Sequence, residues 1–513
     1  MSESLFTQTR ISRRGVLAGS TAAAIAALMP QLLARPASAQ ATPQAVDEIT
    51  IDLEVEPATL DPALTNDLNG WSVVHSVYDS LVNLSPTGEA EPLLAESVTF
   101  PDPLTCRIVL RPNRVFHDGS PVNAASVQAA LDHIRDPKTA SQVADNFKVI
   151  DKLTIVDDLT VDLALSAPAP WLLAQMAPWW TPFPASAAAN IGQQPVGAGP
   201  FKFVSWTPGE SLVVEADPNY PADSTKGQPI AKKVTFRFVP ESSTRVADLL
   251  SGSASIIRSV PPDQASAVQD GGAAIVAQPV TGIAFVRVAN DVAPFTDARV
   301  RQALNYAVDV ETIIAALLNG NGAHLASLFP QGGLGYDPNL APMAFDPDKA
   351  KSLLAEAGVG DGFETTMEIT NSEPDPIAEA IAGMLGNVGI KVTVKPTELA
   401  TFNATWKDAT TAPLRYVSWR PLNDPYTLLS LVISNAGFLS RFKSDTLQPL
   451  IDQGAVEPDQ ETRAGIYRQL GAAMQQDPPA IFVNSLVSLY GVMADLPPWT
   501  SRNDDYTIPT HVG

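Results

Sequence analysis

The chain has 513 residues, of which 45% are hydrophobic and 17% charged, and its formal net charge is −22. This balance is typical of soluble globular proteins rather than membrane or disordered ones, and the length favours about three domains at about 150 residues each. So negative a protein repels phosphates, and we expect no nucleic acid partner. The single cysteine, Cys106, excludes an internal disulfide and a cysteine-based zinc or iron–sulfur site within one chain.

The first 39 residues have the pattern of an export signal. Ser12-Arg13-Arg14-Gly15-Val16-Leu17 precedes an alanine-rich apolar stretch that runs to Met29, and Ala37-Ser38-Ala39 follows. The paired arginines resemble the twin-arginine type, and the apolar stretch is shorter than the roughly 20 residues that cross a bilayer. We expect cleavage after Ala39 and a mature protein outside the cytoplasm, in the periplasm or cell envelope. No cysteine near that point could carry a lipid anchor.

The rest of the chain alternates between strand-like and helix-like segments. Apolar residues at every second position predict strands over residues 49–55, 104–110, 234–240 and 389–394, and Cys106 then points into a core. Apolar residues at three- and four-residue steps predict a helix over residues 69–84. Asp297 is expected to cap another helix, and Asp346-Pro347 opens one that Gly358 closes. Such alternation predicts mixed α/β domains.

Motifs for catalysis are missing from the sequence. It contains no GxxxxGK(S/T) phosphate loop, no GxSxG elbow and no HExxH, and its five histidines have no metal-ligand spacing. His117-Asp118 resembles an acid–base pair, but it lies in a turn-forming segment with Gly119, and we interpret it as structural. We therefore predict no enzyme, no catalytic residue, no metal and no cofactor. An exported hydrolase is the weaker alternative.

Several strings in order resemble the peptide/nickel-type solute-binding proteins of ABC importers, extracellular solute-binding family 5. They are Leu60-Asp61-Pro62 and residues 77–82, 91–97, 104–121, 195–203, 294–307 and 349–358. Each string alone is modest, but together they span most of the chain in the family's order. The resemblance implies a periplasmic-binding-protein-like fold, type II, with two lobes and three domains (cluster C-like).

That resemblance also implies a discontinuous domain arrangement. We expect a signal peptide at residues 1–39, domain I at 40–84, 193–276 and 481–513, domain II at 85–192 and domain III at 277–480. Hinges are expected near residues 275–280 and 478–482. The lobes of such proteins close around a ligand, which shifts the population between open and closed forms.

The function implied is that of a receptor, expected to be a monomer, which captures peptides or a similar medium-sized solute and delivers it to the permease subunits of an ABC transporter. In peptide-binding relatives an Asp three residues after a Trp pairs with the peptide's amino group. Here Trp419 is followed at that distance by Leu422, and Asp424 fits better the structural Asp-Pro that comes later. A metal chelate, an opine or an oligosaccharide therefore stays open as the ligand.

Six residues are our candidates for contact with the ligand. We expect Trp419 to provide stacking or apolar contact, Arg415 to bind a ligand carboxylate and Asn423 to form hydrogen bonds; Glu56, Asn66 and Trp71 are candidates from the first lobe. Trp171, Trp179 and Trp180 form an aromatic group that we expect to pack in the core or between lobes.

Overall fold

The computed structural model describes residues 45–86, 88–370, 375–420 and 423–512. The predicted signal at residues 1–39 and the residue Leu422 thus lie outside the described part of the chain. Within those ranges, no helix has both the length and the hydropathy needed to cross a bilayer.

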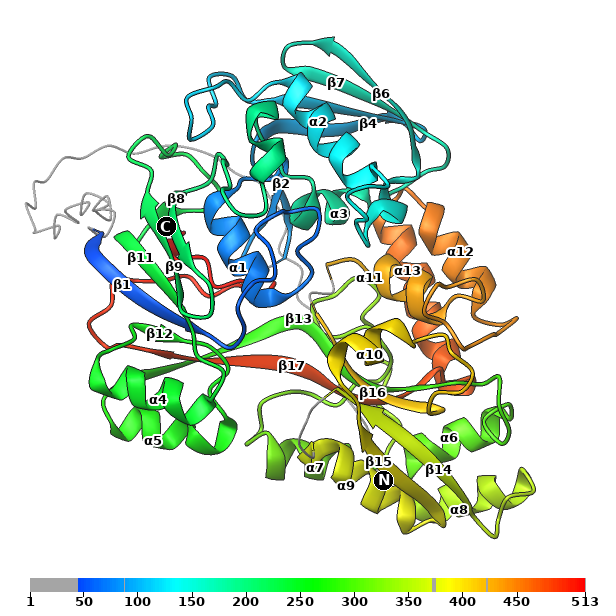
Figure 1. The fold of residues 1–513 in the computed structure, drawn as a ribbon. Helices are drawn as coiled ribbons and strands as arrows, with labels where there is room; N and C mark the ends of the chain where they lie inside the picture. The colour runs from blue at the N-terminus through cyan, green and yellow to red at the C-terminus, as the bar shows by residue number, and fades with distance from the viewer. Residues whose placement is uncertain (1–44, 87, 371–374, 421–422, 513) are drawn as a thin grey trace, which may run out of the picture. The chain divides into compact units, whose positions relative to one another are not determined.

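One mixed sheet of ten strands organises most of the protein (Figure 1). Its order is β15-β14-β16-β13-β17-β12-β1-β11-β9-β8, and it contains both parallel pairs, such as β1 with β11, and antiparallel pairs, such as β13 with β17. The strands are β1 (Val46–Leu53), β8 (Phe201–Thr207), β9 (Ser211–Ala216), β11 (Ala231–Phe238), β12 (Ile256–Ile257), β13 (Ala274–Val288), β14 (Phe363–Ile369), β15 (Ile390–Pro396), β16 (Leu414–Trp419) and β17 (Ala480–Val492).

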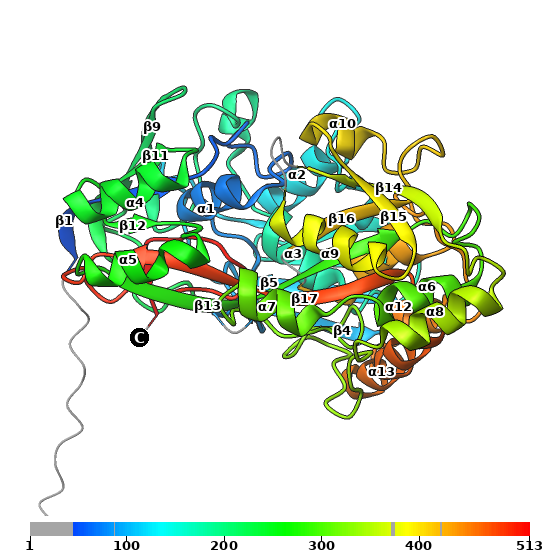
Figure 2. The same ribbon diagram turned by 90° about the horizontal axis from the view of Figure 1, so that it is seen from below.

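The two longest strands, β13 and β17, run antiparallel through the middle of this sheet, as Figures 1 and 2 show. Their register is regular from Ala274↔Val492 to Pro279↔Val487, is interrupted, and resumes at Ile283↔Ser485, with a further shift of one residue between Ala284 and Phe285. On one side of the interruption β17 pairs with β12, and on the other side β13 pairs with β16. The interruption therefore divides the sheet into two halves that share one pair of strands.

The described residues form separate buried clusters on the two sides of that interruption. We call residues 46–260 and 487–512 the N-terminal block, and residues 283–485 the central block. β17 contributes to the cores of both, with Tyr490 and Val492 in the first and Ile481, Phe482 and Val483 in the second. Residues 43–513 nevertheless group as one compact unit, and the predicted three-domain boundaries stay a prediction.

A second sheet, of four antiparallel strands, belongs to the N-terminal block. Its order is β4 (Ala95–Asp102), β5 (Thr105–Leu110), β7 (Thr160–Leu165), β6 (Ile150–Asp157), and helix α2 (Ala124–Arg135) shares its buried cluster. Cys106 lies on the buried face with 0% exposure, and burial raises the pKa of its thiol to about 12. The prediction that Cys106 points into a core is confirmed.

Helix caps follow the sequence signals. Asp297 accepts a hydrogen bond from the Arg299 amide at the start of α6 (Ala298–Tyr306), and Asp346 accepts one from the Lys349 amide in α8 (Pro347–Glu356). Gly358, with φ of +80°, follows the end of α8, as glycine commonly does. His117-Asp118 forms the predicted turn, in which Asp118 accepts hydrogen bonds from Ser120.

The predicted helix over residues 69–84 is wrong at its end. Helix α1 spans Leu68–Val77 only, and β2 (Val82–Leu84) follows and pairs with β3 (Ala90–Pro92). The cause is a distant segment: the Gly199 amide donates to the Val77 carbonyl at 2.9 Å. A Cβ atom on Gly197 would lie 2.1 Å from that same carbonyl oxygen, so this close approach requires glycine.

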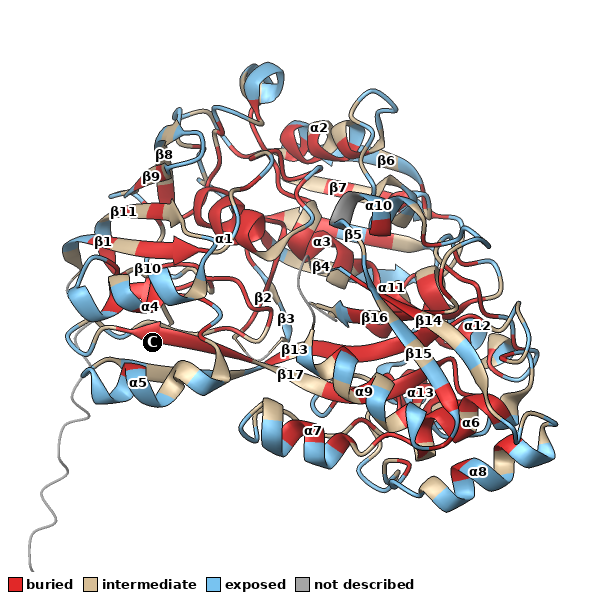
Figure 3. Ribbon diagram, turned by 60° about the horizontal axis from the view of Figure 1, so that its bottom comes forward, coloured by how far each residue is buried: buried red, intermediate tan, exposed pale blue. Residues whose placement is uncertain are grey.

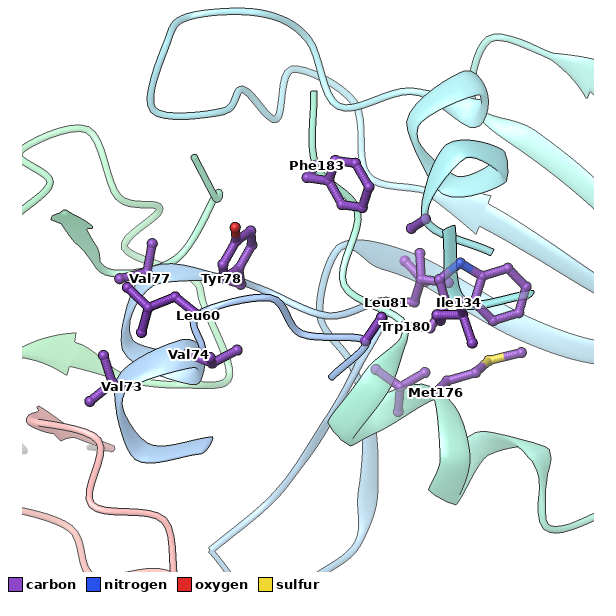
Figure 4. Packing of buried hydrophobic residues seen from close by; sticks show 14 of the residues in the cluster. Leu60, Val73, Val74, Val77, Tyr78, Leu81, Ile134, Met176, Trp180 and Phe183 are labelled. Atoms are coloured by element: carbon purple, nitrogen blue, oxygen red, sulfur yellow. The ribbon is translucent and has the colours of Figure 1, made fainter. Parts of the chain in front are cut away.

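Helix α1 is buried on nearly all sides, which positions the residues around its start (Figure 3). Val73, Val74 and Val77 pack in the cluster that also contains Trp180 and Met176, shown in Figure 4. The remaining helices are α3 (Leu172–Trp179), α4 (Ser242–Ser251), α5 (Ala265–Asp270), α7 (Val310–Leu317), α9 (Pro376–Gly386), α10 (Leu399–Ala404), α11 (Pro425–Leu428), α12 (Gln448–Val456) and α13 (Gln460–Gln476).

Candidate functional site

Four charged residues from four separate segments meet where the two blocks join, and we call them the junction cluster: Glu54, Arg258, Arg420 and Asp505. Arg258 lies between two carboxylates, with Nε 3.4 Å from Glu54 Oε2 and Nη2 3.3 Å from Asp505 Oδ2. Arg420, at the end of β16 in the central block, places Nη1 3.2 Å from the same Asp505 oxygen. The cluster therefore links the two blocks through the ion pair of Arg420 with Asp505.

Asp505 is the fixed centre of this cluster. It is fully buried and has a φ of +66°, a strained backbone conformation for a residue other than glycine, of the kind that is common at functional sites. Tyr490 donates its hydroxyl to Asp505 Oδ1 at 2.5 Å, and Arg258 Nη1 donates to the Asp505 carbonyl at 2.7 Å. These bonds hold the carboxylate in one place.

The electrostatics of the cluster favour charged forms. Burial by itself lowers the pKa of Arg258, but the charges of Asp505 and Glu54 outweigh this effect and raise it. Burial pushes the pKa of Glu54 up, and the Arg258 charge and the Ser259 hydroxyl bring it below its usual value. At neutral pH Glu54 is thus a carboxylate and Arg258 a guanidinium group.

An aromatic platform lies in the N-terminal block at α1 and the C-terminal segment, and consists of Trp71, Trp179 and Tyr506. Trp71 contacts Tyr506 with ring centroids 5.5 Å apart and Trp179 at 6.0 Å, and His75 stacks on Tyr506 at 5.0 Å. Burial lowers the pKa of His75 well below its usual value, with the charges of Lys226 and Arg502 acting in the same direction. The platform is therefore a group of largely buried rings beside a neutral imidazole.

Unsatisfied polar atoms gather around the cluster and the platform. Among the described residues, most buried side-chain polar atoms without a hydrogen-bond partner lie in these segments: Glu54 Oε2, Asn69 Oδ1, Trp71 Nε1, His75 Nε2, Asn83 Nδ2, Trp179 Nε1, Arg258 Nε, Arg502 Nη1, Asn503 Oδ1, Asp505 Oδ2 and Tyr506 Oη. The atoms of Glu54, Arg258 and Asp505 still lie at ion-pair distance from opposite charges. Buried polar groups are normally satisfied, so ordered water or a bound molecule would supply the missing hydrogen bonds here.

The predicted site residues Trp419 and Asn423 of the central block lie in different surroundings. Trp419 ends β16, pairs with Ile283 of β13 and is half-buried directly before Arg420. Asn423 is half-buried and precedes Asp424, which caps α11 and forms a bidentate ion pair with Arg463 at 2.6 and 2.8 Å. Asp424 therefore has the structural role that its Asp-Pro sequence indicated.

Arg415 has its partners inside the central block. It is fully buried, and its Nη2 lies 2.6 Å from Glu368 Oε2, while Nη1 donates to the Phe402 carbonyl at 3.0 Å. Its guanidinium also lies 4.4 Å from the centre of the Phe402 ring. These groups occupy Arg415 inside the central block, so we no longer assign it to a ligand carboxylate.

The three candidates from the first lobe, Glu56, Asn66 and Trp71, lie in separate places in the structure. Glu56 accepts hydrogen bonds from Trp206 Nε1 at 2.8 Å and from the Gly209 amide at 2.9 Å, which ties it to the β8–β9 hairpin. Asn66 is exposed and donates to Gln142 at 3.1 Å. Of the three, the structure brings only Trp71 to the platform. Glu56 and Asn66 therefore have local structural partners.

Trp171, Trp179 and Trp180, which we expected to pack in the core or between lobes, also lie in different surroundings. Trp180 is fully buried (Figure 4) and donates to the Val127 carbonyl at 3.0 Å, and Trp171 stacks on Tyr426 of the central block. Trp179 belongs to the platform. Within the described residues, no group of three or more His, Cys, Asp or Glu side chains is arranged to hold a metal ion.

Comparison with known proteins identifies the family of the chain. The family described as bacterial extracellular solute-binding proteins, family 5 Middle, matches residues 89–439. The glutathione-binding protein GsiB of Pectobacterium atrosepticum is 32% identical over 345 residues, which cover 66% of each chain, so the match spans about two thirds of that relative. The probable D,D-dipeptide-binding periplasmic protein DdpA of Escherichia coli is 28% identical over 465 residues, covering 85% of this chain and 88% of DdpA.

Solved structures agree with this assignment. The periplasmic binding protein DppA from Helicobacter pylori, in complex with the peptide STSA, superposes with a TM-score of 0.80 at 22% identity, covering 91% of this chain and 98% of DppA. AgaA from A. tumefaciens, in complex with agropinic acid, gives a TM-score of 0.76 at 28% identity over 91% of this chain and 99% of AgaA. The predicted mixed α/β fold of periplasmic binding proteins is confirmed, and the relatives are binding proteins. The chain belongs to the family 5 bacterial extracellular solute-binding proteins.

Proposed function

We propose that the protein is the extracytoplasmic receptor of an ABC importer, which captures a peptide or a similar medium-sized solute and delivers it unaltered to the membrane permease. The observation that carries this proposal is the junction cluster with its neighbouring platform, because together they concentrate buried polar atoms without a hydrogen-bond partner in the N-terminal block, where Arg420 of the central block reaches it. A solute that fills these hydrogen bonds favours the closed form by its differential affinity for the two forms.

The sheet supports a hinge for such a movement. The β13–β17 pairing is interrupted between Pro279 and Ile283, opposite Val487 and Ser485, and these are the strands that both blocks share. Hinges are commonly a few residues that absorb changes in backbone angle. We therefore assign the hinge to residues 279–283 and 485–487; the second segment lies further along β17 than residues 478–482, where the sequence had suggested it.

Two further parts of the proposal rest on the sequence and the family. We propose that residues 1–39 direct export through a twin-arginine-type signal, and that the mature protein acts outside the cytoplasm as a monomer. A non-peptide ligand of the opine class is a second candidate. The observation in its favour is the likeness to AgaA, which was solved with agropinic acid.

The test is a thermal-shift screen of the purified protein over peptides, opines, sugars and metal chelates. A bound solute stabilises the folded form by about 2.7 kcal/mol at a concentration of 100 times its Kd. Mass spectrometry of solute that co-purifies with the protein identifies the natural ligand. A screen without any stabilising solute, or conversion of a peptide to products by the pure protein, would contradict the receptor role.

A pair of matched variants locates the site. Trp71→Ala removes a platform ring and is expected to weaken solute binding at least about tenfold, since tryptophans that contact a binding partner commonly carry a large share of the binding energy. Trp206→Ala is the control, because this half-buried tryptophan contacts Glu56 on the β8–β9 hairpin, away from the platform. Equal affinities for the two variants would remove the platform from the site.

A further inference from the structure

On the basis of the proposed receptor function, we infer that Arg420 binds an acidic group of the solute, and that this arginine rather than Arg415 makes the protein select carboxylate-bearing ligands. Arg420 is the side chain of the central block whose charge reaches the junction cluster, through its ion pair with Asp505. It is therefore placed at the boundary that closes around a solute.

The hydrogen-bonding capacity of Arg420 is largely free. A guanidinium group has five N–H donors. Nη1 lies 3.2 Å from Asp505 Oδ2, and no described residue accepts a hydrogen bond of normal geometry from Arg420. Its side chain is 32% exposed, whereas Arg415 is 0% exposed and paired. The remaining donors of Arg420 can therefore reach a bound molecule.

Arg420 is the second cation at Asp505. The Asp505 carboxylate also has Arg258 at 3.3 Å and the Tyr490 hydroxyl at 2.5 Å, and Arg258 is shared with Glu54. Arg420 faces Asp505 through Nη1 only, and a ligand carboxylate is the group that matches the rest of its planar fork of donors in two parallel bonds. Asp505 serves to hold Arg420 in position.

The backbone also fixes the start of the Arg420 side chain. A Cβ atom on Gly282 would lie 2.8 Å from Arg420 Cβ and 3.3 Å from the Trp419 carbonyl oxygen. Gly282 thus lets the end of β16 lie close over β13 at the interruption between the blocks. The binding of a ligand carboxylate to Arg420 would consequently depend on the relative position of the two blocks.

The test uses a tripeptide library without Asp or Glu, prepared as free acids, as C-terminal amides and as N-acetylated acids. Binding is measured by competition and native mass spectrometry for the wild type, Arg420→Gln, Arg420→Lys and, as a matched surface control, Arg299→Gln, since Arg299 is 46% exposed on α6. We expect the wild type and Arg299→Gln to prefer acids over amides by at least about tenfold, as for a hydrogen bond to a charged group.

Arg420→Gln should bind acids and amides equally, and Arg420→Lys should retain part of the preference because it keeps a point charge. An Arg420→Gln protein that still prefers acids, or a wild type that binds both forms equally, overturns the inference and leaves the receptor function standing. Loss of binding on N-acetylation without loss on amidation also overturns it, because the cluster would then recognise an ammonium group. A wild type that binds none of the three libraries counts instead against a peptide as the solute. In that case agropinic acid and its amide replace the tripeptides in the same comparison.

Discussion

Trp171 of the N-terminal block and Tyr426 of the central block stack face to face, with ring centroids 4.1 Å apart and planes 5° from parallel. Trp171 also donates to the Ala455 carbonyl at 3.1 Å, and Gln175 donates to Thr427 at 2.8 Å. Helix α3 is thereby joined to α11 and α12, at a contact separate from the junction cluster. Besides the shared strands β13 and β17, this contact and the ion pair of Arg420 connect the two blocks.

The first prediction concerns this stacked pair. Tyr426→Ala is expected to shift the protein toward an open form, because it removes a ring that spans the two blocks. The apparent solute Kd then rises in proportion to the lost closed fraction, and small-angle scattering of the solute-free protein shows a larger radius of gyration. A double-mutant cycle that combines Tyr426→Ala with Trp171→Ala should give a coupling free energy between the two rings of about 0.5–1.5 kcal/mol. Additive effects of the two substitutions would contradict direct coupling.

The second prediction separates Arg415 from solute binding. Arg415→Met leaves the carboxylate of Glu368, which is 3% exposed, without its buried partner, and should lower the free energy of unfolding by about 3–5 kcal/mol. The double variant Arg415→Met/Glu368→Leu should recover much of this loss. Urea unfolding measures both, and solute affinity at a temperature where each variant is folded should stay unchanged. A selective loss of affinity for acidic solutes would restore the ligand role of Arg415.

The third prediction concerns the glycine segment that ends α1. Gly197→Ala places a Cβ atom against the Val77 carbonyl and should destabilise the protein by about 1–3 kcal/mol, as overpacking does. Gly383→Ala in α9 is the control, because an added Cβ there meets nothing within 4 Å, and it should stabilise the helix by about 0.5–1 kcal/mol. Thermal unfolding compares the two variants. Equal melting temperatures would show that the close approach of Gly197 to Val77 does not contribute to stability.

The fourth prediction is a loss of stability on mild acidification. Burial lowers the pKa of His75 and of His117 in the folded protein. The unfolded chain takes up protons near the ordinary histidine pKa of about 6.5, and the folded chain resists them, so the free energy of unfolding falls as the pH drops below that value. Each group contributes a slope of up to about 1.4 kcal/mol per pH unit. Urea titrations at successive pH values should show this decline, and His75→Gln should make it shallower. A free energy of unfolding that rises on acidification through this range would contradict the assignment.

Local signals in the sequence predicted much of the fold. Alternating apolar residues located β5 and the burial of Cys106, and the caps at Asp297 and Asp346 located α6 and α8. The end of α1 could not be predicted in this way, because the contact that terminates it comes from Gly197 and Gly199, far along the chain. Helical periodicity in the residues after Val77 was therefore misleading.

The candidate site was predictable only in part. Trp71 and Trp419 come from segments with recognisable strings, but Arg258 and Asp505 have no local pattern that marks them, since their role depends on β12 and the C-terminal segment lying beside β1. The choice between Arg415 and Arg420 depends on which positions of β16 are covered. β16 lies inside the sheet between β14 and β13, so alternation along the strand does not separate a covered from an open position.

The return of β17 to the N-terminal block has a consequence for the order of assembly during synthesis. Tyr490 and Val492 belong to the core that begins with β1, and Tyr506 packs on Trp71, so that core lacks part of its wall until the ribosome has made nearly the whole chain. In the central block, by contrast, the fully buried members of the core clusters extend to Val483 among the described residues, with Leu486 packed against them. Domains tend to fold as units while the chain emerges. We therefore expect the middle of this protein to reach its native packing before its beginning does.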